Sequence, residues 1–169
     1  MYIFDIDGTL LDTIDAISFH LNETLRKYEL KAIPKEKVLE FVGNGPRVLI
    51  DKTMAYVGFT GNEALKEEIY NRYNEAYDND PVYLTKPFDG IRESLDKLKE
   101  NGEVIAAFSN KPDETSNRVL KAIFGERYFD YILGYREDYK RKPSPEGIMI
   151  IANHFDVPFS KIMYFGDSE

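Results

Sequence analysis

The sequence contains no cysteine and no tryptophan, and only 2 of its 169 residues are histidines. Without cysteine, a disulfide, a thiolate nucleophile, a zinc-thiolate site and an iron–sulfur cluster are all excluded. His20 and His154 lie in amphipathic helical patterns with no nucleophilic or acidic neighbour at a suggestive spacing, so we expect structural or surface roles for both. These shortages argue against thiol chemistry and against a Ser/His/Asp hydrolase.

Positive charge and long apolar runs are scarce as well. Lys and Arg number 22 against 30 Asp and Glu, a formal net charge of −8, so the long-range attraction needed for nonspecific nucleic-acid binding is missing. No run reaches the length of a membrane span, and the start of the chain has no basic segment followed by an apolar stretch. We therefore expect a soluble cytoplasmic monomer or homodimer whose partner is neither nucleic acid nor membrane.

Apolar residues make up 43% of the chain, enough to build a core. A short apolar strand at 2–7 is followed by helical periodicity at 14–28, 34–41, 46–57 and 65–77. From 89 onward helices and strands alternate, with helices at 89–102, 113–124 and 145–154 and strands at 104–108, 131–133 and 162–165. This order predicts an α/β fold: a Rossmann-like parallel sheet core formed by residues 1–13 and 86–169, with an inserted α-helical cap at 14–85.

Polar side chains follow the predicted strands. The first strand ends in Asp5 and Asp7, the second in Ser109 and Asn110, and the fourth in Asp167, while Lys142 lies in the loop before the helix that precedes the fourth strand. Ligands of open parallel sheets bind outside the carboxyl ends of the strands, where these groups would meet. Carboxylates suit Mg²⁺, and an ammonium with neutral donors suits phosphoryl oxygens, so the set predicts a site for a metal ion and a phosphate.

The motifs differ in specificity. Asp-x-Asp-Gly-Thr at 5–9 is highly specific, because Asp5 is embedded in apolar sequence, where an unpaired charge costs several kcal/mol. Ser109-Asn110 taken alone is equally an ordinary helix cap. Lys140-Arg141-Lys142 alone is equally a solvated loop, and Gly166-Asp167-Ser168 an ordinary turn after a strand. Their common order at strand ends is what favours a site.

The ordered set resembles the haloacid dehalogenase superfamily and, within it, the small phosphatases of the phosphoglycolate phosphatase type. Residues 5–13 resemble the family's first motif, Ser109-Asn110-Lys111 the second, Lys142-Pro143 with Pro145 the third, and Gly166-Asp167-Ser168 the start of the fourth. The resemblance implies a Mg²⁺-dependent phosphomonoester hydrolase acting on a small phosphorylated metabolite. It covers nearly the whole chain.

The resemblance also implies roles. Asp5 would be the nucleophile that forms an aspartyl-phosphate, and Asp7 would protonate the leaving alcohol and then accept a proton from water. Mg²⁺ would be held by Asp5, the backbone carbonyl of Asp7, and Asp167. Ser109, Asn110 and Lys142 would hold the transferring oxygens, and Lys142 would also offset the charge of Asp5.

Two further points concern substrate. A halide leaves without a proton, so the carboxylate at Asp7 favours phosphoryl transfer over dehalogenation. In the cap, Gly43-Asn44-Gly45 with Arg47 offers a flexible turn at a helix N-terminus and a guanidinium, which suit a small carboxylate or a second phosphate. A plain turn between helices is the other interpretation of these cap residues.

One departure from the family matters. The family's fourth motif continues with a second acidic residue and a further helix and strand, whereas this sequence ends at Glu169. We therefore expect the last core strand to be missing from an incomplete chain. Two alternatives to the phosphatase stay open: a sugar phosphomutase built on the same core, and an inactive truncated fragment.

Overall fold

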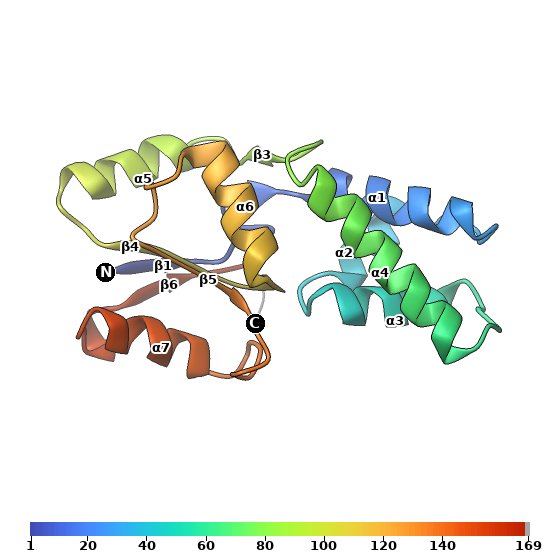
Figure 1. Ribbon diagram of the computed structural model, residues 1–169. Helices are drawn as coiled ribbons and strands as arrows, with labels where there is room; N and C mark the ends of the chain where they lie inside the picture. Colours follow the sequence, from blue (N-terminus) through green and yellow to red (C-terminus); the bar gives the residue numbers. More distant parts are fainter. Residues whose placement is uncertain (168–169) are drawn as a thin grey trace. The chain divides into compact units, whose positions relative to one another are not determined.

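A computed structural model describes residues 1–167, which form two compact units. The first unit combines Met1–Asp12 with Lys86–Glu169, and the second is Thr13–Thr85. The chain leaves the first unit through β2 (Leu11–Asp12) and returns through β3 (Lys86–Pro87), which pair antiparallel. The second unit is therefore an insertion into the first. The two strands of the first unit that flank it, β2 and β3, lie side by side (Figure 1).

The first unit contains a parallel sheet with the order β5-β4-β1-β6. β1 (Tyr2–Phe4) lies between β4 (Ile105–Pro112) and β6 (Met163–Phe165), and β5 (Tyr131–Tyr135) lies beyond β4. Neighbouring strands are parallel in every pair, and the predicted α/β fold with a parallel sheet is confirmed.

Helices cover both faces of this sheet (Figure 1). α5 (Ile91–Glu100) and α6 (Asp113–Phe124) lie on one face, where Leu95 and Leu120 pack against Phe4 and Ile105. α7 (Glu146–His154) lies on the other face, and a short 3₁₀ turn, Phe159–Lys161, leads from it to β6. Successive strand residues alternate between these two cores, as expected for a sheet buried on both faces.

Two predictions about this unit are wrong in detail. The predicted strand at 104–108 is longer, because β4 continues through Ser109, Asn110 and Lys111 to Pro112 beside β5. The helix predicted at 89–102 is shorter, since α5 begins at Ile91 and ends at Glu100. The N-cap of α5 is Gly90, whose φ of +80° suits glycine and turns the chain into the helix one residue later.

The second unit consists of α1 (Ile14–Lys27), α2 (Lys35–Phe41), α3 (Pro46–Tyr56) and α4 (Glu63–Asn79). Pro46 occupies the first turn of α3, where its missing N–H is not needed, and the Asn62 side chain caps α4 by accepting a hydrogen bond from Leu65 N at 2.9 Å. The apolar stripes of the helices meet in one core. Its buried members are Ala16, Ile17, Leu21, Leu25, Ile33, Val38, Leu49, Ile50, Met54, Ile69, Tyr73 and Tyr77.

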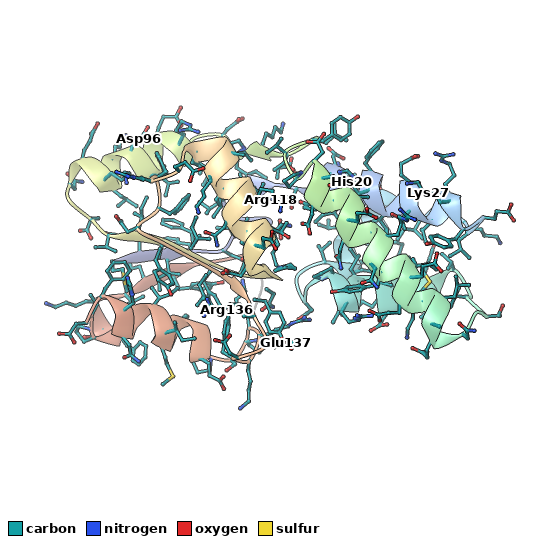
Figure 2. The ribbon with its side chains drawn as sticks, viewed as in Figure 1. His20, Lys27, Asp96, Arg118, Arg136 and Glu137 are labelled. Carbon is teal, nitrogen blue, oxygen red and sulfur yellow. The ribbon has the colours of Figure 1, made fainter. Side chains whose placement is uncertain are left out.

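His20 lies in α1 (Figure 2), and its ring contacts neighbouring aromatic rings. Its ring centroid is 5.4 Å from that of Phe19 and 5.4 Å from that of Tyr77, and the residue is only 7% exposed. Among the described residues, its Nε2 has no hydrogen-bond partner. Burial lowers the pKa of His20, against the opposing influence of Asp80.

Within residues 1–167, no helix is both long enough and apolar enough to cross a bilayer.

Candidate active site

The predicted site residues of the first unit lie near the carboxyl ends of β1, β4 and β6. Phe4 is in register with Ala107 on one side and Phe165 on the other, so Asp5 follows β1 between the two neighbouring strand ends. The backbone N–H of Asp5 continues the ladder by donating to the Phe165 carbonyl at 2.8 Å. The parallel sheet thus fixes the backbone of Asp5 on a rigid element.

Asp5 is a buried carboxylate paired with Lys142. It is 5% exposed, and its Oδ2 lies 2.5 Å from Lys142 Nζ. Its Oδ1 accepts a hydrogen bond from the Ile6 backbone N–H at 2.7 Å. Burial raises the pKa of Asp5, while the charge of Lys142 opposes that rise. Burial also disfavours the ammonium of Lys142, but its interactions with Asp5 outweigh this and raise the pKa of Lys142. Lys142 is therefore a protonated partner for Asp5.

Asn110 and Tyr164 hold Lys142 in place. Asn110 Oδ1 accepts from the Lys142 backbone N–H at 2.8 Å, and Asn110 Nδ2 donates to the Lys142 carbonyl at 3.3 Å. At the end of the side chain, Lys142 Nζ donates to Tyr164 Oη at 3.0 Å. The prediction that Asn110 binds substrate oxygens stays a prediction, and the structure adds a second task for its amide, which is to position the Lys142 loop.

Asp7 is paired with a second lysine. Both of its carboxylate oxygens lie 3.1 Å from Lys111 Nζ. The side chain of Lys111 is 8% exposed and that of Asp7 is 24% exposed. Asp5 and Asp7 are therefore paired with different lysines, Lys142 for Asp5 and Lys111 for Asp7.

Ser109 is buried in β4 at 3% exposure, and its Oγ accepts a hydrogen bond from the Lys111 backbone N–H at 3.2 Å. The N-cap of α6 is Pro112, so neither Ser109 nor Asn110 is the capping residue of that helix. Both side chains are instead buried polar groups at the end of a central strand, a position typical of ligand-binding residues in parallel sheets.

Asp167 follows β6 and approaches Gly8. A Cβ atom built on Gly8 would lie 2.2 Å from Asp167 Oδ2, so this carboxylate occupies the space that only a glycine leaves open. Ser168 of the same motif lies outside the described residues. Within residues 1–167, no three side chains of His, Cys, Asp or Glu form a cluster able to hold a metal. The predicted set needs fewer, since it combines the carboxylates of Asp5 and Asp167 with a backbone carbonyl, and these hard oxygen donors fit Mg²⁺.

The predicted cap residues belong to the second unit. Gly43 and Gly45 have φ of +102° and +85° in the turn before α3, with Asn44 between them. Arg47, in the first turn of α3, lies 2.5 Å from a Glu67 carboxylate oxygen, and its guanidinium lies 3.5 Å from the centre of the Tyr70 ring. Arg47 is thus held by two residues of α4.

Sequence reasoning gave no role to Lys111, Tyr164 or Gly8. Lys111 and Asp7 are 104 positions apart, and the 22 positions between Lys142 and Tyr164 likewise conceal their contact. For Lys111 a signal existed: a lysine directly after two predicted site residues, at the end of a buried strand, needs a partner for its charge.

Comparison with known proteins finds similarity over nearly the whole chain. The family model described as haloacid dehalogenase-like hydrolase matches residues 2–169. A phosphoglycolate phosphatase of Aquifex aeolicus is 30% identical over 167 residues, which cover 99% of this chain and 75% of that protein.

Two crystal structures show the same fold. A candidate phosphoglycolate phosphatase from Lactobacillus delbrueckii subsp. bulgaricus shares 29% identity at a TM-score of 0.81, covering 99% of this chain and 77% of that one. A predicted phosphoglycolate phosphatase from Haemophilus somnus superimposes with a TM-score of 0.94 at 22% identity, covering 99% of this chain and 76% of that one, a likeness of fold alone.

Proposed function

The chain belongs to the haloacid dehalogenase-like hydrolases and is a phosphatase, and from that premise we propose that it hydrolyses a small phosphomonoester through an aspartyl-phosphate on Asp5. The observation that carries this proposal is the buried Asp5 carboxylate with Lys142 Nζ at 2.5 Å, at the end of the central strand. Burying a charged carboxylate costs free energy even when it is paired, and buried charge pairs at the ends of parallel strands are candidates for functional sites.

In the first step, an Asp5 oxygen attacks phosphorus while the bond between phosphorus and the ester oxygen breaks. The leaving oxygen takes a proton from the Asp7 carboxyl group and departs as an alcohol. Lys142 keeps the carboxylate of Asp5 oriented and balances negative charge as the phosphoryl group arrives.

In the second step, water attacks the phosphorus of the aspartyl-phosphate. Asp7, now a carboxylate, accepts a proton from that water, and the bond between Asp5 and phosphorus breaks to release inorganic phosphate. One carboxyl group therefore serves as acid and then as base, which requires Asp7 to keep the same place throughout. Ser109 and Asn110 donate to the transferring oxygens from the end of β4.

Mg²⁺ is the cofactor that we propose for this site. Asp5, the backbone carbonyl of Asp7, and Asp167 would hold it, and it would supply positive charge beside the phosphoryl oxygens. The close approach of Asp167 to Gly8 supports this set, because it carries the carboxylate toward the loop that follows Asp5.

The substrate class that we propose is a small phosphorylated metabolite, with 2-phosphoglycolate the first to test because relatives bear the name phosphoglycolate phosphatase. Gly43, Asn44 and Arg47 stay the predicted substrate-selecting residues of the cap. Because Arg47 is held by Glu67 and Tyr70, a substrate carboxylate would have to compete with Glu67 for the guanidinium. The cytoplasmic location and the state as a monomer or homodimer also stay predictions.

The test is a phosphate-release screen over small phosphate esters with Mg²⁺ present, run on the wild-type protein and on Asp5→Asn. We expect turnover by the wild type and a loss of at least about 1,000-fold in the variant, since no covalent intermediate can form. The matched control is Asp138→Asn, an exposed carboxylate paired with Arg136. Retained activity in Asp5→Asn would remove Asp5 as nucleophile, and conversion of glucose 1-phosphate to glucose 6-phosphate would identify a phosphomutase instead.

A further inference from the structure

A buried lysine that the proposed steps do not use lies directly beside the acid and base of the reaction. Lys111 Nζ is 3.1 Å from each of the two Asp7 oxygens, and its side chain is 8% exposed. Taking an ammonium out of water costs several kcal/mol, and ordering a lysine side chain costs about 2 kcal/mol more. Burying a lysine at this position therefore costs free energy, which suggests that its charge has a function here.

The backbone of Lys111 is fixed before its side chain is considered. Its N–H donates to Ser109 Oγ at 3.2 Å, and its carbonyl accepts from Ser116 Oγ at 3.3 Å. Both hydroxyl groups are buried, at 3% exposure for Ser109 and 0% for Ser116. The ammonium of Lys111 therefore extends from a rigid strand toward Asp7.

Asp7, by contrast, lies on a short loop after β1. The loop closes through hydrogen bonds from Gly8 N to Leu11 O at 3.0 Å and from Leu10 N to Ile6 O at 3.0 Å, which fix its backbone but not the Asp7 side chain. The Asp7 side chain is instead held by its ion pair with Lys111. Since the ammonium is equidistant from both oxygens, it restricts the orientation of the carboxyl group, and the Asp7 side chain is still 24% exposed.

We propose that Lys111 is a positioning residue for Asp7, holding its carboxyl group in the one orientation that serves both proton transfers. This inference rests on the proposed function, because it requires Asp7 to act as acid and base. Lys111 is then distinct in task from Lys142, which contacts the nucleophile. A residue that acts only through Asp7 should matter only where a proton transfer by Asp7 limits the rate.

The choice of leaving group separates reactions that need a proton from Asp7 from reactions that do not. Phenyl phosphate releases a poor leaving group that needs a proton from Asp7, whereas 4-nitrophenyl phosphate releases a stable anion that does not. General acid catalysis is worth about 100- to 10,000-fold, so we expect Asp7→Asn to lower kcat/KM for phenyl phosphate by at least about 100-fold and for 4-nitrophenyl phosphate by under about 5-fold.

Lys111→Met keeps the length of the side chain and removes its charge. We expect it to lower kcat/KM by about 10- to 50-fold for phenyl phosphate and by under about 3-fold for 4-nitrophenyl phosphate. The double variant with Asp7→Asn should lose no more than Asp7→Asn alone, because both changes remove one task. Lys111→Gln is measured in parallel so that the comparison does not depend on one variant folding, and Lys140→Met, at an exposed lysine, is the matched control.

Each outcome of these measurements either supports or overturns the proposed role of Lys111. A selective loss with the poor leaving group in both Asp7→Asn and Lys111→Met supports the inference. An equal loss on both substrates in Lys111→Met and Lys111→Gln would make Lys111 a ligand of the phosphoryl group or a structural residue, and no loss would make it dispensable; either result overturns the inference alone. If Asp7→Asn itself shows no dependence on the leaving group, the proposed acid role of Asp7 fails first.

Discussion

The side-chain amide of Asn110 is hydrogen bonded to both sides of the Lys142 backbone, accepting from its N–H at 2.8 Å and donating to its carbonyl at 3.3 Å. A central strand thus holds the loop that carries the lysine paired with Asp5. Because Asn110 belongs to β4 and Lys142 lies outside the helices and strands, the position of the Lys142 backbone depends on an amide that belongs to a different element.

Asn110→Ala tests this relationship. Loss of the two hydrogen bonds should let the Lys142 loop move, and a displacement of about 1 Å at a reacting group costs on the order of 100-fold in rate. We expect kcat to fall by about 30- to 100-fold in steady-state phosphate release. Asn117→Ala, which removes an amide bonded to the Asp113 carbonyl at 3.0 Å within α6, is the control and should leave kcat unchanged. Full activity in Asn110→Ala would show that Lys142 is held by other contacts.

Gly8→Ala tests the approach of Asp167 to the first motif. The new Cβ would lie 2.2 Å from Asp167 Oδ2, so the carboxylate has to move. We expect the Mg²⁺ concentration that gives half-maximal activity to rise by at least about 10-fold, in line with the effect of disturbed metal ligands.

The control for Gly8→Ala is Gly102→Ala. Gly102 has φ of +74°, close to the +81° of Gly8, but no atom lies within 4 Å of a Cβ built there. Both variants carry the same backbone strain, and only Gly8→Ala displaces Asp167. A similar change in Mg²⁺ dependence for the two variants would assign the effect to backbone strain.

His20→Phe tests whether the buried histidine makes stability depend on pH. The pKa of His20 is lowered in the folded protein, so the unfolded chain binds a proton more readily. The contribution of the neutral His20 to the free energy of unfolding is therefore complete above about pH 6.5 and decreases as the pH falls below that value. We expect the wild-type melting temperature to drop more between about pH 7.5 and about pH 5.5 than that of His20→Phe, which keeps an aromatic ring in the cluster. The exposed His154 supplies the control as His154→Gln, and an unchanged pH dependence in His20→Phe would contradict the prediction.

Gly147→Ala tests the packing of α7 on the sheet. A Cβ at this position would lie 2.2 Å from two ring atoms of Phe108, whose side chain is 1% exposed and has no room to move. Alanine favours a helix by about 1 kcal/mol over glycine, but overpacking costs about 1–3 kcal/mol, so we expect net destabilisation of about 1 kcal/mol. The melting temperature should fall by about 2–4 °C. Asn153→Ala, at an exposed position of the same helix, should not lower it, and a rise in Gly147→Ala would show that Phe108 gives way.

Helices were predicted well from the sequence because their signals are local. The α6 boundaries, Asp113 and Phe124, agree with the sequence prediction because an acidic first turn and a 3.6-residue period mark them within one stretch of chain. The continuation of β4 through Ser109 to Lys111 was missed. Strand propensity there is low, and pairing with β5, which no local pattern reveals, extends the strand.

In the candidate site too, local sequence patterns predicted some residues, whereas contacts between distant segments could not be predicted from them. Asp5 and Asp7 could be predicted as site residues because an aspartate in an apolar strand conflicts with local burial, and such conflicts are expected at functional positions. The partners of these aspartates, Lys142 and Lys111, come from distant segments. For Lys142 a family motif compensated for the distance. For the contact between Lys111 and Asp7 only the folded chain supplies the information.

The place of β1 in the middle of the parallel sheet has a consequence for the order in which the protein is made. β1 is synthesised about 100 residues before its partner β4 and about 160 residues before its partner β6. At about 5–20 residues per second, β1 waits on the order of 10–30 s for its second neighbour. The helical unit at Thr13–Thr85 is complete much earlier. We therefore expect the helical insertion to fold first on the ribosome, and Asp5 to reach its folded environment only when β6 has been synthesised.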